Sequence, residues 1–125
     1  MYRILEKKSL NNNVEEMVIL APYVARFCQL VLNGGVLDGK RYLSEAAVQQ
    51  MTSRQTGEPL KESYGFGWSV SADACVHGGA CATNMTIDRQ RGLILVWMVQ
   101  HSGFPGDGGK AQDVFRKAAL ERFGR

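Results

Sequence analysis

The longest apolar run in the chain, residues 93–99, is the feature that most limits the fold. Its sequence, Leu-Ile-Leu-Val-Trp-Met-Val, carries no charge and is rich in branched side chains. The run is too short to cross a membrane as a helix. Branched residues at successive positions instead favour a central strand that is covered on both faces. The chain is therefore predicted to build a sheet around residues 93–99.

Further strands and a closing helix are predicted around this run. Residues 64–70 alternate large apolar side chains with glycine and serine, which is typical of a strand, and another strand is expected at residues 82–88 before a turn at 89–92. Residues 110–123 follow a helical pattern. The side chains predicted to face inward from that helix are Ala111, Val114, Phe115 and Ala118.

Two helices are predicted ahead of the sheet. Pro22 suits the first turn of a helix that stops at residues 33–35, and Ser44 can cap a second one. The side chains predicted to face inward are Val24, Phe27, Cys28 and Val31, followed by Ala47, Val48 and Met51.

The N-terminal segment, residues 1–20, is predicted to be separate from the rest. Asparagines 11–13 favour a hairpin turn, and a helix through residues 15–20 is the alternative. For residues 21–125 we expect an α+β fold. Its antiparallel sheet has three to five strands and is flanked by a C-terminal helix and two short helices.

Composition and charge limit the classes of partner. A net charge of +3 with scattered basic residues does not predict nucleic-acid binding. No apolar run reaches the length of a membrane span, and the first residues lack the apolar stretch of a signal peptide. Three cysteines, an odd number, argue against a disulfide framework. We therefore expect a cytoplasmic protein with no nucleic-acid or membrane partner.

A series of short motifs runs through residues 22–123. They are Ala25-Arg26-Phe27, Leu32-Asn33-Gly34-Gly35, Leu43-Ser44, Met51, Tyr64-Gly65-Phe66-Gly67-Trp68, His77-Gly78-Gly79-Ala80, Ile87-Asp88 and Gly92-Leu93. Their order and spacing resemble the C-terminal part of the serine beta-lactamase and DD-peptidase-like hydrolases, a penicillin-binding, class C-type family. Residues 1–20 have no counterpart in this resemblance.

The resemblance implies where a site would lie. In the family, a Lys-Thr-Gly or His-x-Gly motif edges the active site, and His77-Gly78-Gly79 is its counterpart here. The resemblance implies that His77 faces the pocket and that the backbone N–H of Ala80 is one oxyanion donor. The family's other motifs are Ser-x-x-Lys, which supplies the nucleophile, and Tyr-x-Asn or Ser-x-Asn.

The catalytic set is predicted to be incomplete. No serine is followed three positions later by lysine, and no tyrosine is followed two positions later by asparagine. Because a serine hydroxyl needs an adjacent base to attack a carbonyl, the chain is predicted to lack hydrolase activity alone. The third motif would then be vestigial, and no cofactor is expected.

Three functional hypotheses remain open. The first is a truncated family domain, carried as a mobile or orphan gene, with a binding or assembly role toward an unidentified ligand; self-association would cover its open sheet edge. The second is the C-terminal half of a split hydrolase, completed by a separately encoded N-terminal half. The third is a metal-binding protein using Cys75, His77 and Cys81, with His101 or an acid as the fourth ligand. A cysteine nucleophile beside His77 is a further reading of the same residues.

Overall fold

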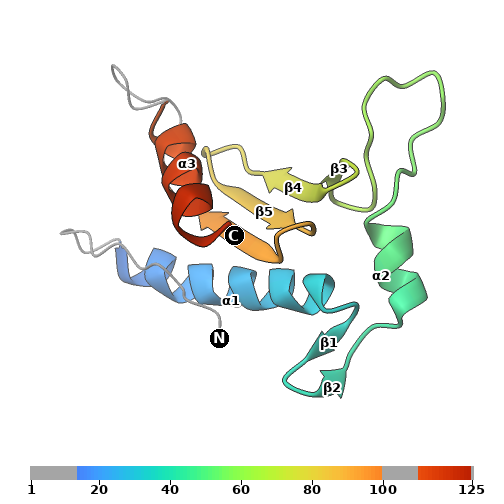
Figure 1. The fold of residues 1–125 in the computed structure, drawn as a ribbon, viewed down its shortest axis with the longest axis horizontal. Coiled ribbons are helices and arrows are strands. Elements are labelled where there is room, and N and C mark those ends of the chain that lie inside the picture. The colour runs from blue at the N-terminus through green and yellow to red at the C-terminus, as the bar shows by residue number, and fades with distance from the viewer. Residues whose placement is uncertain (1–13, 100–109, 125) are drawn as a thin grey trace.

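The computed structural model describes residues 14–99 and 110–124, with side chains from residue 21 onward (Figure 1). The described part of the chain forms three helices, a small hairpin and a four-stranded antiparallel sheet, so the predicted α+β fold is confirmed. The elements outside the sheet are α1 (Val14–Leu32), β1 (Val36–Leu37), β2 (Lys40–Arg41), α2 (Glu45–Met51) and α3 (Ala111–Phe123). None of the helices in the described ranges is long and apolar enough to span a membrane.

The sheet is ordered β3-β4-β5-β6, and each strand is antiparallel to its neighbour. Its strands are β3 (Ser69–Val70), β4 (Ala74–Gly78), β5 (Asn84–Asp88) and β6 (Leu93–Trp97). The apolar run at residues 93–99 does form a strand, but β6 lies at the edge of the described sheet, so the prediction of a central position is not met. Local composition predicts that both faces are buried but carries no information on lateral pairing.

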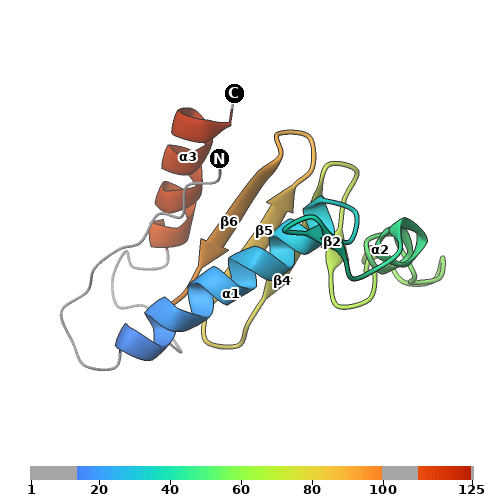
Figure 2. The same cartoon turned by 90° about the horizontal axis from the view of Figure 1, so that it is seen from below.

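The core lies between α1 and one face of the sheet, and Figure 2 shows α1 running obliquely across the strands. Cys28 and Val31 of α1 pack with Cys75 of β4 and Ile87 of β5, which are paired across the two strands. Burial of these apolar side chains supplies most of the free energy that holds the helix on the sheet.

The opposite face of β6 is covered by α3. Trp97 pairs with Asn84, while Met85 lies on the α1 face, so strand alternation puts Trp97 on the other face. Its ring packs against Phe115 of α3 at a centroid distance of 5.3 Å. This contact sets the rotation of α3, so Ala119 is buried whereas Val114 is 66% exposed. The prediction that Val114 and Ala118 face inward is therefore wrong.

The N-terminal hairpin prediction is wrong for the part of it that is described. Residues 14–20 belong to α1, which confirms the helical alternative; residues 1–13 lie outside the described residues. Apolar residues recur at helical spacing through 14, 17, 18, 21, 24, 25 and 28. Pro22 therefore lies inside the helix, where one backbone hydrogen bond is lost, and does not begin it.

Residues 64–70 form a tight hairpin, where one strand was predicted. The N–H of Gly65 donates to the carbonyl of Trp68 at 2.8 Å, and Gly67 has a φ of 81° that favours glycine. The alternation of aromatic residues with glycine reflects this turn. Trp68 is 2% exposed and its ring stacks on Phe27 of α1 at 6.1 Å, which ties the hairpin to the core.

Candidate functional site

His77 lies near the end of β4, opposite Met85 of β5, and is half-buried. Alternation along β4 places His77 on the same face of the sheet as Cys75, which is the face that α1 covers. The three residues that follow it, Gly78, Gly79 and Ala80, are exposed. The predicted third motif therefore runs from the covered face of the sheet to the surface.

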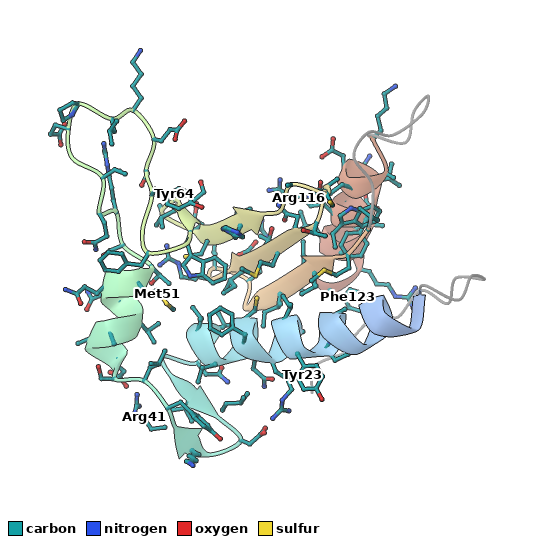
Figure 3. All side chains as sticks on the ribbon, turned by 180° about the vertical axis from the view of Figure 1, so that it is seen from behind. Tyr23, Arg41, Met51, Tyr64, Arg116 and Phe123 are labelled. Carbon is teal, nitrogen blue, oxygen red and sulfur yellow. The ribbon has the colours of Figure 1, made fainter. Side chains whose placement is uncertain are left out.

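The partner of His77 is Tyr64. The Tyr64 hydroxyl Oη lies 3.2 Å from His77 Nδ1, and both side chains are half-buried. Figure 3 shows Tyr64 at the end of the sheet where β3 pairs with β4. The Tyr64–Trp68 motif contributed to the predicted resemblance, but Tyr64 was not predicted as a functional residue. The motif itself could have indicated this role, because a Gly-x-Gly turn directly after a tyrosine limits the positions that the tyrosine side chain can occupy.

The backbone of Tyr64 is held by the loop that precedes it. Its carbonyl accepts from the N–H groups of Gln55 at 2.8 Å and Thr56 at 3.3 Å. Its own N–H donates to the Thr56 hydroxyl Oγ1 at 3.3 Å, and that hydroxyl donates to the carbonyl of Glu62 at 2.6 Å. These bonds close the loop and leave the phenol ring free to extend toward β4.

The β4–β5 turn carries the remaining motif residues. The N–H of Gly79 donates to the carbonyl of Thr83 at 2.9 Å, and that of Ala82 donates to the carbonyl of Gly79 at 3.1 Å. The N–H of Ala80, between them, has no acceptor among the described residues. This arrangement is compatible with the donor role that the resemblance implies for Ala80; the role itself stays a prediction.

The metal-binding hypothesis gains no support from the geometry. Within residues 14–99 and 110–124, no three His, Cys, Asp or Glu side chains are arranged to hold a metal ion. Cys75 is fully buried in the core while Cys81 is exposed on the turn, so Cys75, His77 and Cys81 are not brought together. His101, the predicted fourth ligand, lies outside the described residues.

Cys75 is also disfavoured as a nucleophile beside His77. Burial raises the pKa of the Cys75 thiol, an effect that the positive charge of Arg89 partly opposes. Cys75 therefore stays a neutral thiol at ordinary pH, and the thiol form is the unreactive one. Among the described residues no carboxylate is hydrogen-bonded to His77, so the orienting acid of a catalytic triad is missing there.

A hollow of about 270 Å³ lies elsewhere, between the end of α1, α2 and the sheet. Its lining is Val31, Leu32, Gly34, Glu45, Val48, Gln49, Thr52, Cys75, Ile87 and Arg89. His77 and Tyr64 are not part of this lining. The hollow is therefore separate from the third motif, and Cys75 is the one predicted site residue among its lining.

Three serines of the described chain form local hydrogen bonds with the backbone. Ser44 caps α2 by accepting from the N–H of Ala47 at 3.1 Å, and the hydroxyls of Ser53 and Ser71 donate to nearby carbonyls. None of the hydroxyls in this part of the chain is hydrogen-bonded to His77 except that of Tyr64. Ser9-Leu10-Asn11 matches the Ser-x-Asn pattern but was not predicted as a motif, and it lies outside the described residues.

Comparison with known protein families agrees with the motifs. The model of the beta-lactamase family matches residues 7–120. The match begins before the boundary at residue 21 that the motifs predicted, and α1 also runs through that boundary without a break. No curated protein matches the chain significantly. Since the family model covers most of the sequence, the predicted resemblance is confirmed and the chain belongs to the beta-lactamase family.

Proposed function

We propose that these 125 residues form a beta-lactamase-like region that performs no acyl transfer alone and serves in binding or assembly. In this proposal the region presents one wall of the family's site. The wall consists of Tyr64 and residues 77–80, and it is called the third-motif wall below. The observation that carries the proposal is that no serine in the sequence is followed three positions later by lysine. Acyl transfer by a serine needs a base beside the hydroxyl, and an oxyanion donor without a nucleophile has no intermediate to stabilise.

The geometry around His77 supports this proposal. His77 Nδ1 is engaged with the hydroxyl of Tyr64 at 3.2 Å, and among the described residues no serine hydroxyl is hydrogen-bonded to the ring. The wall of the site is nevertheless well built, because the Tyr64 loop and the β4–β5 pairing hold both partners in place. A wall with donors and no nucleophile suits recognition better than turnover.

The experiment is a turnover assay on the purified chain with a chromogenic cephalosporin and a p-nitrophenyl ester. We expect the wild-type chain and the His77→Ala variant to give the same rate as buffer. His77→Ala is the matched control because it removes the third-motif side chain from an otherwise unchanged strand. Turnover by the wild-type chain that disappears in His77→Ala would contradict the proposal.

A second candidate is half of a split enzyme, in which another chain brings the nucleophile to His77. The observation that favours it is the position of β6, whose outer edge pairs with no strand within the described ranges. The edge strand, Leu93–Trp97, is entirely apolar and carries none of the charges that usually protect an edge. Residues 14–20 do not fill this place, because they lie in α1.

The solution mass of the purified chain separates the two candidates. A stable dimer near twice 13.8 kDa supports assembly, since self-association covers the edge that another chain would need. A monomer that exposes the edge supports the split enzyme instead. The measurement is light scattering after size exclusion, repeated over a tenfold dilution so that a weak dimer is seen to dissociate.

A further inference from the structure

We propose that Tyr64 is a positioning residue that holds His77 in the tautomer with the proton on Nε2. His77 then offers the site an N–H donor instead of a basic lone pair. The inference rests on the proposed function, because it says what the third-motif wall presents to a ligand. Its starting point is the Tyr64 Oη to His77 Nδ1 contact of 3.2 Å.

Hydrogen-bond accounting decides the direction of this contact. A neutral imidazole has one donor and one acceptor nitrogen, and a phenol donates once. If the Tyr64 O–H donates to Nδ1, the proton of the ring is on Nε2 and only that N–H still needs a partner. If Nδ1–H donates instead, both the phenol proton and the Nε2 lone pair are left without partners.

The described surroundings offer nothing to rescue the second arrangement. Among the described residues, the Tyr64 hydroxyl and the His77 ring have no hydrogen-bond partner except each other. The arrangement that leaves fewer polar groups without a protein partner is favoured, because a group partly withdrawn from water gains less from hydration. Tyr64 is therefore the donor.

Both partners are anchored strongly enough for the contact to control the ring. The carbonyl and N–H of Tyr64 are each bonded to the loop at residues 55–56. Behind the tyrosine, Gly65 packs so closely that a Cβ there would lie 2.4 Å from the carbonyl oxygen of Met51. His77 is fixed from the other side by the pairing of β4 with β5.

This tautomer has a chemical consequence. A general base must accept a proton on a free ring nitrogen, and with Nδ1 engaged and Nε2 protonated the neutral ring has none to offer. The Nε2–H, and the N–H of Ala80 that lacks an acceptor in the described structure, are both donors. Each of these two N–H groups can therefore bond an acceptor oxygen, such as that of a carbonyl or carboxylate.

The test is the nitrogen NMR spectrum of the His77 ring in uniformly labelled protein, recorded at about pH 8.5. A His101→Gln variant assigns the two histidines. We expect the wild-type ring to be mainly Nε2-protonated. In Tyr64→Phe, the ratio of Nε2–H to Nδ1–H tautomers should fall by roughly two- to tenfold, the effect of losing one neutral hydrogen bond.

Tyr42→Phe is the matched control, because Tyr42 is exposed and its ring contacts Lys40. That variant should leave the His77 spectrum unchanged. A wild-type ring protonated mainly on Nδ1 would overturn the proposal without any variant. An unchanged tautomer ratio in folded Tyr64→Phe would overturn it as well. Neither result depends on turnover, so failure here is distinct from failure of the proposed function.

Discussion

Replacing Trp68 by alanine tests how the site is attached to the core. The Trp68 side chain is 2% exposed, and its ring stacks on Phe27 with an interplanar angle of 9°. Truncating a buried tryptophan to alanine costs about 3–5 kcal/mol of unfolding free energy, because apolar burial is lost and a cavity remains. With a urea slope of about 2 kcal/mol per M, a loss of about 4 kcal/mol lowers the unfolding midpoint by about 2 M.

The assay is urea unfolding followed by far-ultraviolet circular dichroism, since the substitution removes a fluorescent reporter. Phe66→Ala is the matched control: Phe66 lies in the same hairpin, is also aromatic and is 59% exposed. We expect that variant to change the unfolding free energy by less than about 0.5 kcal/mol. Equal losses in the two variants, or a loss below about 1 kcal/mol for Trp68→Ala, would refute the account of this hairpin as a core-anchored turn.

Three further outcomes are expected. Gly65→Ala should lower the unfolding free energy by about 1–3 kcal/mol, because the new Cβ would lie 2.4 Å from a backbone oxygen. Gly57→Ala is the control and should be close to neutral, because the atom nearest to its Cβ would lie at 3.6 Å. Equal urea midpoints for the two variants would contradict this prediction. A thiol reagent should label exposed Cys81 at once and buried Cys28 and Cys75 only after unfolding, and rapid labelling of all three would be inconsistent with the fold. Burial raises the pKa of the Cys28 thiol from 9.0 to about 12. Between these two pH values the folded chain keeps a proton that the unfolded chain releases. The free energy of unfolding therefore falls as pH rises from 9 toward 12. The stability advantage of wild type over Cys28→Ala should therefore shrink by about 1 kcal/mol between pH 8 and pH 10, and a constant difference would argue against it.

The sequence predicted elements whose signal is local. The apolar run at residues 93–99 was correctly interpreted as a strand with both faces covered, and Ser44 as the cap of α2, because burial and capping depend on the residues of the segment itself. The edge position of β6 was missed, since lateral order depends on pairing between separate segments. The start of α1 was predicted at the wrong place because Pro22 was interpreted as the first turn of the helix. Apolar residues at helical spacing also occur before Pro22, and the helix begins there.

The candidate site was predicted only in part. His77 was found through its motif, and the structure places it on the α1 face of the sheet near the surface turn. Tyr64 was not predicted as its partner, because their contact spans 13 residues and exists only after the Gly65–Trp68 turn reverses the chain. A Gly-x-Gly hairpin produces the same alternation of large and small residues as a strand does. The pattern therefore predicted a strand at residues 64–70 and gave no indication of the turn.

The most direct test of the central claim is the intact mass of the purified chain after incubation with benzylpenicillin, with peptide mapping of any adduct. Trapping of an acyl-serine does not require turnover, so this measurement detects a nucleophile even when hydrolysis is slow. Because no serine of the sequence is paired with lysine in the Ser-x-x-Lys spacing, the account predicts an unmodified mass. One equivalent of penicilloyl group mapped to a single serine would contradict it.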